Sequence, residues 1–266
     1  MPQLPPHAVD AHVHLTGDDF APAATRAEDP PAGPLDHWLA RYRDHLAALG
    51  CTRGVIVHSI LYGTDNAVTL AALGKLGEGF AGVALAPDGV EDATLDALAD
   101  RRIRALRLNH VHGGVLTWAG AVALAPRLAD RGMHLEMLAH AHQLPALAED
   151  ICALPCPIVL DHCAWPKDPG DIAPLERLLA EGHAYVKLSA PHRWAGSIAA
   201  AAPVIERLAR ANPERCLWGS DWPHLMLGDA APPDPGAALA QVLDIVTADT
   251  DRARLLVTNP QGLYRL

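Results

Sequence analysis

The feature that most constrains this fold is a regular alternation between short apolar runs and longer segments of helical periodicity. The apolar runs are rich in aliphatic and β-branched residues and have the length of buried strands. They are Val9–Leu15, Gly54–Ile60, Phe80–Ala86, Ala105–His110, His134–His140, Ile158–Cys163, Ala184–Ala190 and Cys216–Trp222. Between them, Leu, Ala and Val recur at helical spacing. The segments with this spacing include Leu35–Leu49, Asn66–Leu76, Ala119–Arg131, Pro203–Ala211 and Ala237–Ala248.

Eight strand–helix units in 266 residues give about 33 residues per unit, the usual size of a strand with its crossover helix. The chain is therefore expected to be an α/β protein, a single (β/α)8 TIM-like barrel over residues 1–266. A doubly wound open sheet is the alternative, but the first run is not followed by the GxGxxG turn of a dinucleotide site. Segment Asp18–Pro34 contains four prolines and no periodic pattern, so we predict a loop at about residues 16–34 over the active-site mouth. A second loop is predicted at Ala230–Pro235.

Composition favours a globular enzyme and excludes several other classes. Half of the residues are hydrophobic, which suffices for a core, and the net charge of −10 argues against a nucleic-acid partner. No run is long and apolar enough for a membrane span, and the first residues do not resemble a signal peptide, so we expect a cytoplasmic protein without a membrane partner. The five cysteines form no CxxC pair, which disfavours both a disulfide framework and a thiolate zinc site. Monomer and dimer are both compatible with the sequence.

Polar residues near the ends of the predicted strands are the candidates for a site, because catalytic groups of such barrels stand at the carboxyl ends of strands. The first run, VDAHVHL, contains His12 and His14, whose spacing places both side chains on one face of a strand. Two imidazoles there can bind a divalent metal or polarise a substrate carbonyl. The alternative is a pair of structural histidines, which their position disfavours. The adjoining Asp10 is a candidate to orient an imidazole.

Two later runs also end in polar residues. In the sixth run, Asp161 and His162 follow the apolar residues, before a turn at Pro166. We interpret His162 as a site residue, whereas Asp161 could have a structural role. Cys163 is interpreted as a small buried residue. The eighth continues into the motif GSDWPH, which contains Asp221. An aspartate beside imidazoles can accept a proton from water or bind a metal, whereas its alternative role is to cap the turn.

Two arginines are candidates for binding an acidic substrate. Arg107 lies in the fourth run and Arg193 follows the seventh, while Arg104 falls nearer the start of its strand. A guanidinium pairs bidentately with a carboxylate or a sulfonate, so Arg107 and Arg193 are predicted to anchor the acidic group of a small molecule. A surface salt bridge is the alternative for each.

The ordered motifs VDAHVHL, HSILYGTDN, RALRLN, VLDHCAWP, VKLSAPHRW and LWGSDWPH resemble the amidohydrolase superfamily, in particular its amidohydrolase-2 branch. The resemblance extends from Val9 to the final NPQGLY and implies a distorted (β/α)8 barrel. It also implies hydrolysis, with decarboxylases and hydratases elsewhere in the branch. The site it implies consists of His12, His14, His162 and Asp221. In lactonases of this branch the aspartate activates water, while the histidines stabilise the carbonyl oxygen or hold a metal.

The same resemblance implies that Ser59 and Tyr62 border the substrate and that Arg107 and Arg193 bind its carboxylates. Lactonases of the branch include metal-free enzymes, whereas close relatives bind zinc. One Zn²⁺ held by the four site residues and a metal-free site are therefore both expected alternatives. A binuclear centre is disfavoured, because no lysine stands at the end of the fourth or fifth run to bridge two metals as a carbamate.

Several other histidines have no predicted role. After RLN the chain reads HVHGG, where lactonases of the branch tend to carry a basic residue for a second carboxylate, and this difference predicts a different substrate. The histidines nearby either replace that contact or are solvated loop residues. The histidines without a predicted role are His58, His110, His112, His140, His142 and His224.

These observations predict an enzyme that opens a small, carboxylated lactone or related cyclic ester by attack of water activated by Asp221. One alternative is a zinc-dependent decarboxylase that uses the same residues. The other is a catalytically inactive barrel that only binds a ligand, and it is disfavoured because all four expected site positions are filled.

Overall fold

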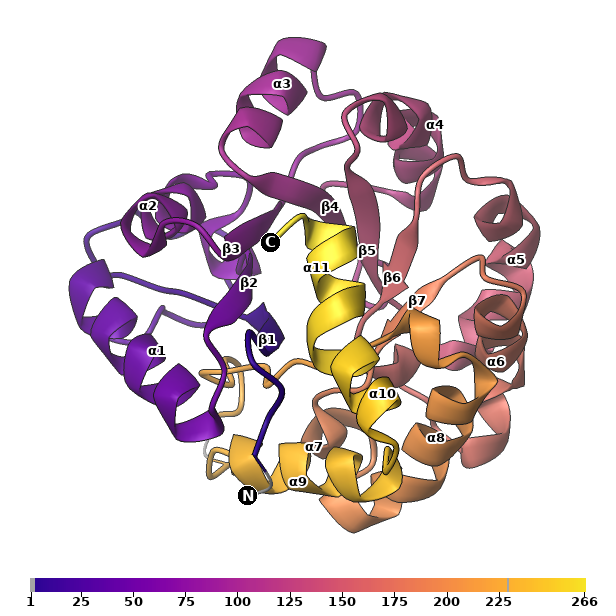
Figure 1. Ribbon diagram of the computed structural model, residues 1–266. Helices are drawn as coiled ribbons and strands as arrows, with labels where there is room; N and C mark the ends of the chain where they lie inside the picture. The colour runs from indigo at the N-terminus through magenta and orange to yellow at the C-terminus, as the bar shows by residue number, and fades with distance from the viewer. Residues whose placement is uncertain (1–2, 229) are drawn as a thin grey trace.

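The computed structural model describes residues 3–228 and 230–266, and it contains an eight-stranded barrel surrounded by helices (Figure 1). Every strand runs parallel to its neighbours, and the strands are ordered in space as they are in the chain. They are β1 Val9–Val13, β2 Arg53–Val57, β3 Phe80–Ala84, β4 Ile103–Asn109, β5 His134–Leu138, β6 Ile158–Leu160, β7 Tyr185–Lys187 and β8 Cys216–Leu217. The predicted (β/α)8 barrel is therefore confirmed.

The helices surround the barrel, and most of them bury an apolar face, as the helical spacing of Leu, Ala and Val predicts. They are α1 Leu35–Leu49, α2 Ala67–Leu76, α3 Asp92–Asp100, α4 Trp118–Asp130, α5 Leu144–Ala153, α6 Ala173–Ala180, α7 Pro191–Trp194, α8 Ile198–Ala211, α9 Pro235–Ile245, α10 Asp249–Ala253 and α11 Asn259–Tyr264. Shorter turns are the 3-10 segments Ile60–Tyr62, Ala141–Gln143, His162–Ala164, Pro169–Ile172 and Pro213–Arg215, and the π-helical segment Arg254–Thr258. Within the described ranges, no helix has the length and apolar character needed to cross a membrane.

The seam between the first and last strands closes the barrel and positions the site. His14 N donates to Trp222 O over 2.7 Å, and Asp221 N donates to His12 O over 2.9 Å. Gly219 lies where the two backbones approach most closely, because a Cβ there would stand 2.5 Å from the Cβ of His12 and 2.7 Å from its N. A glycine at this position thus allows the segment after β8 to lie directly against β1.

The end of the barrel at which the strands begin is covered by α11, the yellow helix that crosses the opening in Figure 1. Its Tyr264 is fully buried against small apolar residues of the barrel interior, among them Val9, Val55 and Ala81. With this end filled, the opposite end, where the strands terminate, is the one available for a site.

The strands stop earlier than the apolar runs predict, and the predicted ends at Cys163, Ala190 and Trp222 were wrong. The physical reason is backbone conformation. Residues 162–165 all have positive φ values between 38° and 56°, and Ala190 has a φ of 49°. Backbone in this left-handed region cannot continue a strand. The predicted ends at Leu15, Ala86, His110 and His140 also lie in the loops beyond their strands, and Ile60 begins a 3-10 turn.

The helix boundaries differ from the prediction by smaller amounts, except at α8. This helix begins at Ile198, five residues before the predicted start at Pro203, because Ser197 caps it by accepting a hydrogen bond from Ala200 N. The helix predicted to end at Ala248 ends at Ile245.

Residues 16–34 contain no helix or strand and contact the loops after β2 and β8. Ala23 N donates to Leu61 O over 2.8 Å, and Met226 N donates to Glu28 Oε1 over 2.6 Å. These contacts attach the segment to loops at the carboxyl ends of the strands. A role for it in covering the active-site mouth stays a prediction.

Candidate active site

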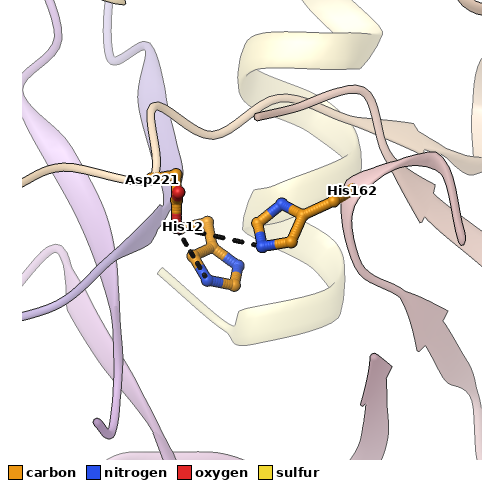
Figure 2. A group of neighbouring side chains, drawn as sticks. All are labelled: His12, His162 and Asp221. Carbon is orange, nitrogen blue, oxygen red and sulfur yellow. Dashed lines mark ion pairs between the residues drawn. The ribbon is translucent and has the colours of Figure 1, made fainter. Parts of the chain in front are cut away.

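Four buried side chains converge at the carboxyl ends of β1, β6 and β8. Oδ1 of Asp221 lies 3.9 Å from His12 Nε2, 3.6 Å from His14 Nε2 and 3.8 Å from His162 Nε2. Figure 2 shows the imidazoles of His12 and His162 turned toward this carboxylate. The structure thus brings together the four residues that the sequence singles out.

Two of these residues sit on strained backbone. The φ values of Asp221 and His162 are 64° and 53°, in the left-handed region that favours glycine. Holding a non-glycine residue there costs about 1–3 kcal/mol, and such conformations concentrate at active sites and ligand clamps. The strain is consistent with a functional requirement for where these two side chains point.

The loop that carries Asp221 is fixed to β1 by Asp10. Oδ1 of Asp10 accepts hydrogen bonds from Ser220 N over 2.8 Å and from His12 N over 3.3 Å. Its Oδ2 lies 3.1 Å from Nε2 of His45. Asp10 therefore orients the imidazole of His45, which the sequence did not single out, and holds the site histidines only through the backbone.

The second oxygen of Asp221 is held by an arginine. Arg193 donates from Nε to Oδ2 of Asp221 over 2.6 Å, and its Nη2 donates to Leu225 O over 2.9 Å. Burial alone would raise the pKa of Asp221, but Arg193 and the surrounding imidazoles together lower that pKa well below its ordinary value. Asp221 is therefore an ionised carboxylate at neutral pH and can accept a proton at Oδ1.

The imidazoles around Asp221 are held in place by hydrogen bonds. Nδ1 of His14 lies 2.7 Å from Val57 O, and Nδ1 of His162 lies 2.8 Å from Ser189 Oγ. Burial lowers the pKa of His162 to about 3. Burial and the nearby Lys187 lower the pKa of His12 well below its ordinary value. Near neutral pH the rings of His12 and His162 carry no charge and act as hydrogen-bond partners or metal ligands.

Arg107 pairs with the aspartate that the sequence left open to a structural role. Its Nε donates to Oδ2 of Asp161 over 2.9 Å, and Oδ1 of Asp161 lies 3.3 Å from His12 Nδ1. Asp161 is thus a fully buried link between Arg107 and a site histidine. The two Nη nitrogens of Arg107 have no hydrogen-bond partner in the described part of the chain, so they are available to a substrate.

Ser59 and Tyr62, expected to border the substrate, make local contacts. Ser59 Oγ accepts a hydrogen bond from Leu61 N over 3.3 Å at the start of the turn after β2. The hydroxyl of Tyr62 donates to Gly17 O over 3.0 Å and lies 2.7 Å from Thr16 Oγ1. Both residues are buried, and Tyr62 fastens the segment 16–34. Their assignment to substrate binding stays a prediction.

Two of the histidines without a predicted role lie close to the site. His58 is held between Thr69 Oγ1, at 2.8 Å, and Gly63 O, at 3.1 Å, so it supports the loop after β2. His224 packs edge-on against His192, with 5.3 Å between the ring centroids, and His192 Nε2 lies 3.7 Å from Oδ2 of Asp221.

The other four lie in the loops after β4 and β5. The rings of His140 and His142 stack with 5.2 Å between their centroids. His140 and His112 also lie 5.8 Å and 6.1 Å from the ring of Trp165. His110 donates its backbone N–H to Leu138 O.

The sequence analysis missed two charged residues inside the barrel, Lys187 of β7 and Glu136 of β5. Lys187 Nζ lies 2.6 Å from Glu136 Oε2 and 3.1 Å from His12 Nδ1, and both residues are fully buried. The signal that could have found them is a charged residue within a buried strand, as in HLEML and YVK. Such charges are rarely buried without a partner.

By distance, the site can hold a divalent metal. The ligand atoms of His12, His162 and Asp221 all lie within 4.8 Å of one another. Nε2 of His12 is buried and has no hydrogen-bond partner among the described residues. Imidazole nitrogens and carboxylate oxygens are ordinary ligands of Zn²⁺. The structure thus contains a candidate His/Asp metal site.

Comparison with known proteins identifies relatives over nearly the whole chain. A family model described as amidohydrolase matches residues 9–266. The 2-pyrone-4,6-dicarboxylate hydrolase of Comamonas testosteroni is 31% identical, with 98% of this chain and 91% of that protein aligned. The 4-sulfomuconolactone hydrolase of Hydrogenophaga intermedia is 29% identical, with coverages of 98% and 89%. A crystal structure of a candidate 2-pyrone-4,6-dicarboxylic acid hydrolase from Pseudomonas putida is 29% identical with a TM-score of 0.83, covering 98% of both chains.

Proposed function

The chain belongs to the amidohydrolase family over residues 9–266, and on this premise we propose that it hydrolyses a small lactone, or a related cyclic ester, that carries an acidic group. The observation that carries the proposal is the ionised carboxylate of Asp221, surrounded by three imidazoles and accompanied by two arginines. A base, a set of groups that can polarise a carbonyl, and cations for an anionic substrate are the parts that such a reaction needs.

In the proposed reaction, Oδ1 of Asp221 accepts a proton from a water molecule as the water oxygen attacks the lactone carbonyl. His12, His14 and His162 surround the position where negative charge develops on the carbonyl oxygen. The ring C–O bond then breaks, and Asp221 returns the proton to the leaving oxygen. The product is an open-chain hydroxy acid or its keto tautomer, and ionisation of the new carboxyl group releases one proton.

The cofactor is either one Zn²⁺ or none. His12, His162 and Asp221 are the residues that would hold the ion, with His14 beside them. A bound zinc ion would act as a Lewis acid on the substrate carbonyl.

The substrate's acidic group is proposed to bind Arg107 and Arg193. Both use Nε to hold an aspartate, and their side chains are 11% and 14% exposed. The relatives act on a dicarboxylate and a sulfonated lactone, as their names state, so an anionic substituent is common to both. The HVHGG sequence after β4 supports a substrate that differs from theirs in its second substituent.

The alternative of a zinc-dependent decarboxylase is not favoured, because the named relatives are hydrolases that act on cyclic esters. The two reactions differ in product: hydrolysis releases acid by opening a ring, and decarboxylation releases carbon dioxide.

The test is a panel of carboxylated and sulfonated lactones assayed for acid release in weak buffer, with and without a chelator, and with Asp221→Asn as the blank. Turnover that survives chelation supports metal-free hydrolysis. Turnover lost with chelator and restored by zinc supports a mononuclear metal site. Carbon dioxide release from a carboxylated substrate, without ring opening, would overturn the proposal.

A further inference from the structure

Beneath the site lies a buried network of charges that the proposed reaction does not use. Lys187 Nζ lies 2.6 Å from Glu136 Oε2, 3.3 Å from Asp161 Oδ1 and 3.1 Å from His12 Nδ1. Tyr264 donates to the other oxygen of Glu136 over 2.5 Å. Lys187, Glu136 and Asp161 are completely buried. Lys187 thus pairs with two carboxylates, and one of its donors is directed at the back of a site histidine.

The contact with Lys187 determines where His12 carries its proton. An ammonium group has three donors and no acceptor, so Nδ1 of His12 must supply the lone pair of this hydrogen bond. A neutral imidazole has one N–H and one lone pair. The single proton of His12 is therefore on Nε2, the nitrogen that faces Asp221.

Asp161 is the competitor that would favour the opposite tautomer. Its Oδ1 lies 3.3 Å from His12 Nδ1 and could in principle accept an Nδ1–H. Within the described residues, however, this oxygen forms no hydrogen bond, whereas Lys187 Nζ lies at hydrogen-bonding distance from His12 Nδ1, 3.1 Å. The other oxygen of Asp161 is held by Arg107. The arrangement favours Lys187 as the partner of Nδ1.

His14 differs from His12 at this nitrogen. Val57 O can only accept, so Nδ1 of His14 carries a hydrogen, whereas Nδ1 of His12 accepts one from Lys187. Nδ1 of His162 lies 2.8 Å from Ser189 Oγ, and a hydroxyl can either donate or accept, so this contact does not fix the tautomer of His162.

We propose that Lys187 is a positioning residue that fixes His12 as the Nε2–H tautomer, so that His12 donates a hydrogen bond to the substrate carbonyl and opposes metal binding. By distance His12 belongs to the candidate metal site, but a metal ligand needs a lone pair on the nitrogen that faces the metal. Zinc could use His12 only if its proton moved to Nδ1 and the hydrogen bond from Lys187 broke. The tautomer of His12 is a property of the protein without substrate, whereas its hydrogen bond to a substrate carbonyl rests on the proposed function.

The first test uses the unmodified sequence labelled with ¹⁵N-histidine and freed of metal by chelator. Two-dimensional ¹H–¹⁵N spectra that correlate ring nitrogens with ring carbon-bound protons distinguish the two tautomers directly, and single His→Gln variants assign the signals. Two histidines serve as references. His14, whose Nδ1 hydrogen-bonds to Val57 O, should give the Nδ1–H pattern, and His58, which donates from Nε2 to Gly63 O, should give the Nε2–H pattern. His12 should show the same Nε2–H pattern as His58. An Nδ1–H pattern for His12 would overturn the proposal.

The second test measures zinc affinity by competition with a chromophoric chelator. The variant Lys187→Met/Glu136→Gln removes the donor together with its counter-charge, and its zinc affinity should rise by about tenfold or more, the scale on which partners of a ligand tune metal binding. In the same variant, the His12 signal should change toward Nδ1–H, paired with Asp161. A folded double variant with unchanged zinc affinity would overturn the opposition to metal. If the double variant does not fold, the spectrum of the unmodified protein decides the proposal.

Zinc affinity is measured for the parent protein and for the double variant, and in both cases Cys152 is replaced by serine. Cys152, Glu181 and His183 form an exposed group whose ligand atoms also lie within 4.8 Å of one another, and this group would contribute zinc binding of its own. The matched control is Lys75→Met, because Lys75 is half exposed on α2 and pairs with Asp36 on the surface. It should leave both the zinc affinity and the His12 spectrum unchanged.

Discussion

Arg193 donates from Nε to Oδ2 of Asp221 over 2.6 Å, which leaves Oδ1 as the oxygen that faces all three imidazoles. The two oxygens of one carboxylate thus have different partners: one pairs with Arg193, which helps to keep the side chain ionised, and the other faces the imidazoles, where we propose that the reacting water binds. The left-handed backbone of Asp221, with a φ of 64°, directs the side chain into this arrangement.

Asp221→Asn should reduce turnover to below about one tenth of the wild-type rate, because an amide cannot accept the proton from water. Asparagine has nearly the same shape as aspartate, so the variant should still fold, and its melting temperature should fall only a little. The control is Asp249→Asn, whose side chain is completely exposed and should leave the rate unchanged. Steady-state acid release measures both. A rate above one tenth for Asp221→Asn would remove this residue from its proposed role.

Arg107→Lys should raise the KM for an anionic lactone by about tenfold or more, with a smaller change in kcat, because lysine keeps the charge but loses the planar fork. The neutral methyl ester of the same lactone should show little change in KM. Arg127→Lys is the matched control, since Arg127 lies on α4 and pairs with Asp92. Equal effects on the acid and its ester would contradict a contact between Arg107 and the acidic group.

Stability should fall as the pH falls below about 6.5, the ordinary pKa of histidine. Burial lowers the pKa of His134 to about 3 and that of His58 to about 4. Between these values and 6.5 the unfolded chain binds protons that the folded chain does not. Each such histidine therefore lowers the free energy of unfolding by up to about 1.4 kcal/mol per pH unit. Asp221, whose folded pKa is depressed, adds a loss of the same sign only at still lower pH.

Urea unfolding at pH 7, 6 and 5 measures this slope. In His134→Gln the slope should be shallower by up to about 1.4 kcal/mol per pH unit, because one titrating group has been removed. Any constant loss of stability from the substitution cancels when slopes are compared. An identical slope in the variant would show that His134 is not held neutral by burial.

Gly219→Ala should destabilise the fold by about 1–3 kcal/mol and reduce activity, because the added methyl group meets the Cβ and N of His12 and pushes β1 away from the segment after β8. Gly74→Ala is the matched control. Gly74 lies inside α2 with open space around it, so alanine should stabilise the protein by about 0.5–1 kcal/mol. Urea unfolding of the two variants should therefore give changes of opposite sign, and a stable, fully active Gly219→Ala would contradict the seam geometry.

The sequence located four residues of the candidate site because each follows or ends an apolar run, and chain order alone assigns all eight carboxyl ends of a (β/α)8 barrel to one side. It misjudged where several strands end. The polarity of Cys163, Ala190 and Trp222 is compatible with a strand, and nothing local in the sequence specifies a left-handed turn at residues 162–165.

The ion-pair partners of the charged side chains could not be predicted from the sequence. Arg107 and Arg193 were predicted to face substrate, and the structure shows that each also holds a buried aspartate by its Nε. Such a pairing depends on which strands are adjacent and on their register, and neither quantity is encoded in a local pattern.

The sequence by itself determined the fold class and the set of groups available for chemistry, because strand and helix periodicity and the order of the units are local properties of the chain. Tertiary structure alone decided the state of those groups. Lys187 and Glu136 are 51 residues apart, and only the closed barrel brings them together beneath His12. Their contact arises from burial and strand register, and it determines which nitrogen of His12 carries the proton and thus whether this histidine acts as a donor or as a metal ligand.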